Sequence, residues 1–159
     1  MNFIQKCIYE RKLKEERLKE EAFKRSCCPS MVSLEYCMEN LKNQIDAFSI
    51  NKKHISTIDV ERFINDIDLI NMFNADFLRT LKSCQNKNFG AIMQRDKIDY
   101  MLKKKKEYRY IFERFYINFK RVSKGYDFPR RNEILGLMRN AFDFDSSKYH
   151  NPEQSIMIR

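Results

Sequence analysis

The sequence predicts an all-α protein, elongated, of four to five helices with heptad-like stripes and little compact core. Its 159 residues include only three glycines and three prolines, which leaves little material for the turns of a sheet. Charged residues make up 33% and hydrophobic residues 43%, a balance typical of helices with long exposed faces. We expect a charged N-terminal helix at 1–26, a helical region at 30–124 and a C-terminal extension at 125–159.

The first expected helix covers residues 2–26, which contain no glycine or proline and many good helix formers. Its possible apolar stripe has only four members, which are Ile4, Ile8, Leu18 and Ala22. Because so few apolar residues cannot bury the helix in a core, we expect it to lie on a partner or to project.

A break at 27–30 separates the first helix from the second, because Pro29 cannot continue a helix but suits the start of one. Ser30 is a candidate N-cap. The second helix should run to about Phe48, with one apolar stripe formed by Met31, Leu34, Met38, Leu41, Ile45 and Phe48.

The third helix should follow a polar loop at 49–56 and extend to about Cys84. Ser56 with Asp59, or Thr57 alone, offers a cap at its start. Asn74 takes a heptad position in which a polar residue can fix register. A kink at 74–76 is the alternative interpretation.

The fourth helix is expected from about Gln94 to Lys124, ended by Gly125 and then Pro129. Two interleaved seven-residue series, interrupted only by Lys105, predict a stripe that faces a partner. Its members are Ile98, Met101, Tyr108, Phe112, Phe115, Phe119 and Val122. An intramolecular core is the alternative for each of them. A short fifth helix is expected over residues 132–142, followed by a tail without regular structure.

The formal net charge of +9 is unevenly distributed. Residues 1–25 hold eight Lys and Arg against five Glu, and residues 94–131 hold thirteen against five acidic residues. Such a field attracts phosphate backbones or acidic protein surfaces, although a merely solvated face is the alternative. The candidates for RNA phosphate contacts are Lys103, Lys104, Lys106, Arg109 and Arg121.

The residue patterns of catalytic and metal sites are not found in this sequence. The three glycines are scattered, the cysteines lack zinc-ligand spacing, and His54 and His150 have no nucleophile nearby in the sequence. No signal peptide or long apolar stretch accompanies the five cysteines. We therefore expect an intracellular protein with reduced thiols, no membrane segment, no cofactor, no metal and no enzymatic activity.

One part of the fourth helix resembles a known family signature. Its order is Ile98, Asp99, Tyr100, then twelve residues, then Glu113, Arg114, Phe115 and Tyr116. This order resembles the C-terminal signature of the Syf-two family of pre-mRNA splicing factors. Residues 29–36, 56–57 and 64–68 resemble earlier helices of that family, so the likeness covers roughly residues 15–125. Lysines at 103–106 replace the family's usual asparagines, its long N-terminal region is largely missing, and residues 130–159 extend beyond its usual end.

The resemblance implies a non-enzymatic nuclear splicing factor associated with the NineTeen Complex. In the activated spliceosome such a protein bridges helical-repeat scaffold proteins and the snRNA backbone. Two alternatives remain open from the residues alone. One is a basic helical RNA-binding or ribosome-associated protein, and the other is a coiled-coil interaction module without nucleic acid.

Overall fold

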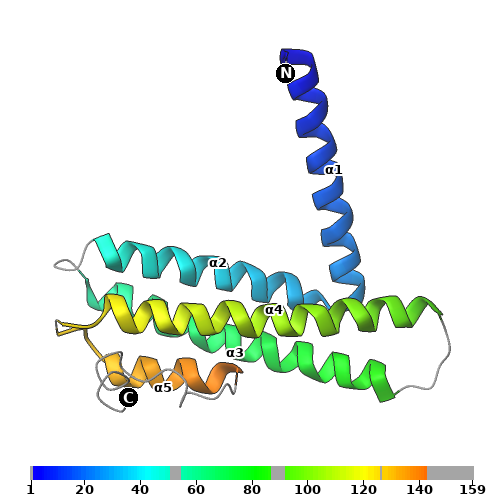
Figure 1. Cartoon of the computed structure of the whole chain (residues 1–159). Coiled ribbons are helices and arrows are strands. Elements are labelled where there is room, and N and C mark those ends of the chain that lie inside the picture. Colours follow the sequence, from blue (N-terminus) through cyan, green and yellow to red (C-terminus); the bar gives the residue numbers. More distant parts are fainter. Residues whose placement is uncertain (1, 51–54, 87–91, 126, 143–159) are drawn as a thin grey trace, which may run out of the picture.

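The computed structural model describes residues 2–50, 55–86, 92–125 and 127–142. These ranges hold five α-helices and no strand, which confirms the all-α fold (Figure 1). The helices lie close to the predicted ranges and are α1 (Phe3–Cys27), α2 (Pro29–Ile50), α3 (Thr57–Asn86), α4 (Ile92–Val122) and α5 (Arg131–Phe142). None of the helices in the described ranges has the length and apolar character needed to cross a lipid bilayer.

Helix α1 projects steeply away from the other four helices (Figure 1). It starts with a capping box, in which Asn2 and Gln5 each accept a hydrogen bond from the other's backbone N–H. Every residue from Asn2 to Glu20 is exposed. Only the last turns of α1 contact the rest of the molecule, as the small apolar stripe of this helix indicated.

Helices α2, α3 and α4 run side by side, and α5 packs on α3 and α4 (Figure 1). Aromatic rings join these helices, because Phe63 of α3 makes edge-to-face contacts with Phe48 of α2 and Phe119 of α4, with ring centroids 5.2 and 5.0 Å apart. Within the described ranges, a continuous set of 27 buried apolar residues runs through the bundle. The core is therefore larger than we expected from the sequence.

The stripe predicted to face a partner is instead part of this core. Its buried members are Met101, Tyr108, Phe112, Phe115, Phe119 and Val122. Ile98 is partly buried and packs against the same core. The prediction of a partner surface was wrong because the stripes of α2 and α3 and the apolar side of α5 already cover these rings. Lys105, which interrupts the stripe, is exposed. Phe142, the last residue of α5, stacks on Phe112 with ring centroids 4.6 Å apart.

The caps and boundaries of the helices agree with the sequence signals only in part. Ser56 and Asp59 form the expected cap of α3, with reciprocal side-chain to backbone hydrogen bonds of 3.1 Å. Ser30 is not an N-cap, because α2 already starts at Pro29 and the Ser30 hydroxyl donates to Asp76 of α3. Helix α3 continues through Asn74. The expected tail at 143–159 lies outside the described residues.

Asn74 is one of the few buried polar side chains of the described core. Its amide donates a hydrogen bond of 3.3 Å to the carbonyl of Ala141, near the end of α5. A buried amide at this position needs a partner, and α5 supplies it. Asn74 therefore fixes how α5 lies on α3, rather than the register of a coiled coil between chains.

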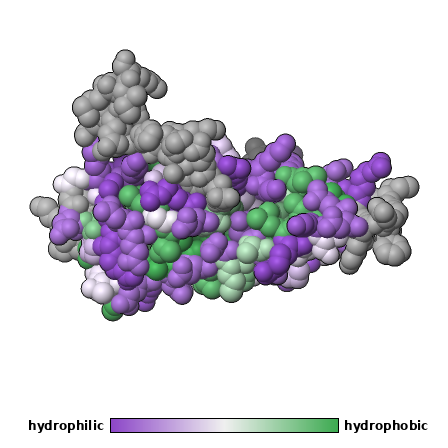
Figure 2. Space-filling model, turned by 90° about the horizontal axis from the view of Figure 1, so that it is seen from below, coloured by the Kyte–Doolittle hydropathy of each residue, from purple (hydrophilic) through white to green (hydrophobic). Residues whose placement is uncertain are grey.

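The molecular surface is mainly hydrophilic on the face seen from below, with hydrophobic residues visible in separate patches (Figure 2). Scattered apolar residues of this kind are normal on a protein surface. The charged residues of α4 are therefore the more informative part of the surface.

Candidate nucleic-acid interface

One side of α4 faces solvent and carries a row of cations. Its exposed members are Lys103, Lys106, Arg109, Arg114 and Arg121. They lie opposite the buried rings of the same helix, because the apolar stripe holds that side against α2, α3 and α5. The amphipathic pattern of α4 therefore fixes both the core and this basic face.

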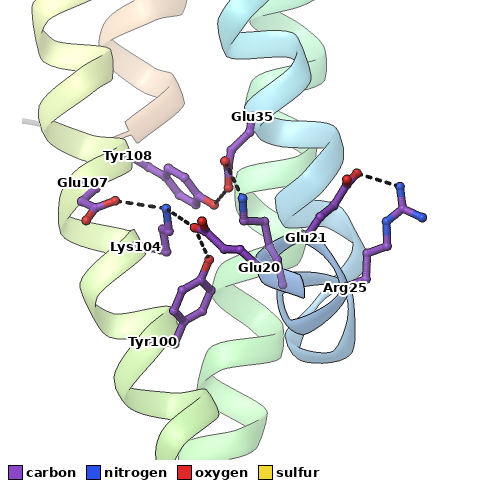
Figure 3. Close-up of polar contacts among 9 residues, drawn as sticks. Glu20, Glu21, Arg25, Glu35, Tyr100, Lys104, Glu107 and Tyr108 are labelled. Carbon is purple, nitrogen blue, oxygen red and sulfur yellow. Dashed lines mark hydrogen bonds and ion pairs between the residues drawn. The ribbon is translucent and has the colours of Figure 1, made fainter. Parts of the chain in front are cut away.

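Lys104 does not belong to this face, although the sequence suggested it as a phosphate contact. Its side chain is only 15% exposed and lies between α1 and α4 (Figure 3). Its ammonium is 3.8 Å from the carboxylate of Glu20 and 3.3 Å from that of Glu107. It also lies over the ring of Tyr100, 5.6 Å from the centroid. Lys104 thus connects α1 to α4 and is already neutralised within the chain.

Two of the exposed cations form ion pairs along α4. Lys103 lies 4.0 Å from Glu107, and Arg109 lies 3.4 Å from Glu113. Exposed pairs at this spacing contribute little free energy, so a polyanion can compete for both cations. Lys103 and Arg109 can therefore still contact phosphate, although Glu107 and Glu113 offset part of their positive charge.

The other three cations of this face have no such compensation among the described residues. Lys106 and Arg114 form no ion pair there. Within the same ranges, Arg121 donates only to the amide oxygen of Asn118, at 3.4 Å. These three side chains therefore present full positive charges to solvent, which is what phosphate contacts require.

An exposed aromatic side chain accompanies these cations. Tyr110 is 63% exposed and lies on the rim of a shallow groove between α2 and α4. Lys42 of α2 and Arg114 of α4 line the same groove, together with Ile111 and Phe115. An open aromatic ring flanked by cations can stack an unpaired base while the cations hold its phosphates. Neither Lys42 nor Tyr110 was singled out from the sequence.

A second group of cations is found where α4 meets α5. Arg131 donates to the Ser123 hydroxyl at 2.8 Å and to the Lys120 carbonyl at 3.1 Å. Arg139 donates to the Tyr116 hydroxyl at 3.3 Å. Both guanidinium groups are thus held by neutral acceptors, and neither forms an ion pair within the described residues. Burial and these two guanidinium groups lower the pKa of Lys120.

The sequence could not reveal this second group. Arg131 and Arg139 are about two turns apart on α5, and the neighbour that each one faces depends on how α5 packs. The short amphipathic helix at 132–142 was predicted, so the missing information was its orientation on α4. Hydrogen bonds to Ser123 and Tyr116 supply that orientation.

The residues of the family-like signature mostly have structural roles in this chain. Tyr100 donates to Glu20 at 3.4 Å and stacks edge-on with Phe23, with centroids 5.1 Å apart, and both contacts help to attach α1. Phe115 and Tyr116 are buried. Asp99 and Arg114 are exposed, and Glu113 is partly buried. The signature therefore describes how α4 is packed and contributes one exposed cation to the interface.

The described residues offer no metal site and no activated cysteine near the basic face. They include no cluster of three or more histidine, cysteine, aspartate or glutamate side chains that could hold a metal ion. Burial raises the pKa of the Cys27 and Cys37 thiols, so neither is an activated thiolate. The arrangement on α4 can bind a partner by charge and by stacking.

Comparison with known proteins gives no match of this chain to a family model, to a curated protein or to a solved structure. The geometry of the basic face is therefore the basis for assigning a function to this chain.

Proposed function

We propose that this protein is a non-enzymatic RNA-binding scaffold, which holds single-stranded or irregular RNA against α4 through the phosphate backbone. The observation that carries the proposal is the row of uncompensated cations on the exposed side of α4, beside the open ring of Tyr110. Phosphate contacts supply affinity without sequence readout, and base stacking favours unpaired segments. Recognition by this face would therefore follow backbone and shape.

The cellular setting that we propose is the spliceosome. The resemblance of residues 98–116 to the Syf-two signature supports a nuclear pre-mRNA splicing factor associated with the NineTeen Complex. Helical-repeat scaffold proteins and the snRNA backbone would then be its partners. Because the aromatic stripe of α4 is buried, protein partners would have to use other surfaces, such as the projecting α1 or the groove between α2 and α4.

The first experiment is a salt titration of RNA binding. Fluorescence anisotropy with a labelled oligouridylate should show binding by the full chain that weakens as salt rises. The triple variant Lys106→Gln, Arg114→Gln and Arg121→Gln should bind more weakly and with a flatter salt dependence. Each lost contact with a single strand removes about 0.7 from the log–log slope, so the triple variant should lose about 2.

A matched control removes the same charge elsewhere. Arg62, Arg79 and Lys82 are exposed cations of α3 rather than α4, and their triple change to glutamine alters the net charge equally. This control should bind almost as well as the wild type. Equal losses of affinity in both triple variants would mean that RNA binding follows the net charge of the chain and is not located on α4. Absence of binding by the wild type would favour an interaction module without nucleic acid.

The spliceosomal setting needs a separate test. Affinity purification of the tagged full chain from native cells, with identification of bound proteins and RNA, should recover helical-repeat splicing factors and snRNA. Recovery of ribosomal proteins and ribosomal RNA instead would retain the RNA-binding function and reject the splicing assignment.

A further inference from the structure

Helix α1 keeps an apolar stripe in solvent along most of its length. Ile4, Ile8 and Leu18 are 68%, 49% and 52% exposed, and Ala22 is exposed as well. A free helix with so little packing is only marginally stable in water, so a partner that covers the stripe would stabilise it. The apolar stripe of α1 is separate from the proposed RNA-binding face on α4.

The stripe points away from the chain's own bundle. The base of α1 is attached through Glu20, which contacts Lys104 (Figure 3), and through Phe23 and Lys24, which contact Tyr100 and Glu35. At 100° per residue, the three attaching residues of α1 lie on the side of the helix opposite Leu18 and Ala22. A second helix can therefore lie along the stripe without displacing the contacts that attach α1.

The spacing of residues along the stripe is the same in both directions, and reversing the direction exchanges only the two central charges. From the N-terminus the stripe reads Ile4, Ile8, Arg11, Glu15, Leu18 and Ala22. Two apolar residues stand at each end, and one cation and one anion stand in the middle. If a second α1 lies antiparallel, with its two-fold axis at the level of residue 13, positions whose numbers add to 26 face each other.

This register pairs every member of the stripe with a complementary one. Ile8 then faces Leu18 of the second copy, and Ile4 faces Ala22. Arg11 faces Glu15 of the second copy, and the two-fold axis repeats each contact. In the described structure neither Arg11 nor Glu15 forms an ion pair within its own chain, so both charges are available. Lys12 and Lys14 flank the stripe near the axis, and their long side chains can extend into solvent.

We propose that α1 is a homodimerisation helix, which pairs with α1 of a second copy in an antiparallel, two-fold symmetric arrangement. Apolar contacts at both ends provide the attraction, and the two Arg11–Glu15 pairs fix orientation and register. A parallel pairing would place Arg11 against Arg11 and Glu15 against Glu15, which opposes it. The dimer would present two basic α4 faces on one assembly.

Charge exchange at the centre gives a sharp test by sedimentation equilibrium of the full chain. The wild type should show a monomer–dimer equilibrium. Arg11→Glu and Glu15→Arg should each raise the dissociation constant at least about tenfold, because each single change creates two like-charge contacts. The double variant should dimerise like the wild type, since it restores both pairs in the opposite sense.

Mixing the two single variants provides the decisive control. An Arg11→Glu chain and a Glu15→Arg chain have fully complementary centres, so their mixture should form a heterodimer although each alone stays monomeric. Heterodimer formation also shows that α1 remains able to form a helix in both variants. The proposal would be overturned by a wild type that stays monomeric at high concentration. It would also be overturned if both single changes left the dissociation constant of the dimer unchanged.

The orientation of the helices can be measured by cross-linking in a Cys7→Ser background. Chains that carry Ile4→Cys should form a disulfide with chains that carry Ala22→Cys, and much less with copies of themselves. Preferential cross-linking of like chains would indicate parallel helices and contradict the proposed register. None of these outcomes depends on whether α4 binds RNA, so failure of either proposal leaves the other testable.

Discussion

The hydroxyl of Tyr108 on α4 donates a hydrogen bond to the carboxylate of Glu35 on α2 (Figure 3). The same carboxylate accepts from the ammonium of Lys24 on α1, at 2.8 Å. Burial, and then the bond to Glu35, raise the pKa of Tyr108, so its hydroxyl stays protonated and able to donate. One carboxylate thereby joins three helices at the point where α1 leaves the bundle.

Replacing Tyr108 with Phe tests this junction. The change keeps the buried ring and removes only the donor, so we expect a loss of about 1–3 kcal/mol in the free energy of unfolding. Urea denaturation followed by circular dichroism measures it. Tyr110→Phe is the matched control, because Tyr110 is exposed on the same helix, and it should leave stability unchanged. Equal midpoints for both variants would show that the bond to Glu35 contributes nothing.

Truncation of the α4 stripe should damage the fold of the isolated chain. Phe112 is fully buried and contacts Phe115 and Phe142. Phe112→Ala should lower the free energy of unfolding by about 3–5 kcal/mol, because it removes a large apolar side chain and leaves a cavity. Ile111→Ala, at the more exposed neighbouring position, should cost far less. Wild-type stability of the purified Phe112 variant would mean that this stripe is not the core.

Lys104 and Lys106 provide a test of the basic face at neighbouring positions. Lys106→Gln should weaken RNA binding and flatten its salt dependence, whereas Lys104→Gln should change both only slightly, because Glu20 and Glu107 already neutralise Lys104. Anisotropy titrations of the two single variants make the comparison at equal net charge. Equal effects would mean that Lys104 leaves Glu20 to contact phosphate.

Much of the fold could be predicted from the sequence, because the relevant signals are local. Pro29 separates α1 from α2, Ser56 and Asp59 cap α3, and Gly125 follows α4 with a positive φ of 86°. The weak stripe of α1 indicated a helix that lies on a partner or projects, and Figure 1 shows that α1 projects from the bundle. In each case the chemistry that decides the element lies within a few residues of it.

The candidate site was less predictable, because it depends on contacts between distant segments. An apolar stripe such as Phe112, Phe115 and Phe119 shows the same pattern whether it faces its own chain or another one. The four lysines at 103–106 look equivalent in the sequence. Lys104 nevertheless forms an ion pair with Glu20, more than eighty residues earlier, and so does not belong to the exposed basic face. Arg139 joins the cations only through the packing of α5.

The buried amide of Asn74 should be necessary for the attachment of α5. Asn74→Ala removes the donor to the Ala141 carbonyl and leaves a small cavity, so we expect a loss of about 1–3 kcal/mol in stability. Hydrogen exchange should show the greatest loss of protection in α5, because that helix depends on the contact. A loss spread evenly over all helices would contradict a specific role in holding α5.

The bond between Ser30 and Asp76 predicts a pH-dependent contribution to stability. The hydrogen bond from Ser30 is the main cause that lowers the pKa of Asp76 below its ordinary value of 3.8, and Arg79 adds a smaller effect. Because the folded state favours the charged carboxylate, this contribution is fully present above pH 3.8 and is lost as the pH falls through the lowered pKa.

Ser30→Ala should therefore lower the free energy of unfolding at neutral pH. The difference in unfolding free energy between this variant and the wild type should become smaller in acid. Denaturation curves from pH 7 to pH 2 measure that difference, and Ser49→Ala at the exposed end of α2 serves as the control. A gap between Ser30→Ala and the wild type that stays constant to pH 2 would show that Asp76 does not respond to Ser30.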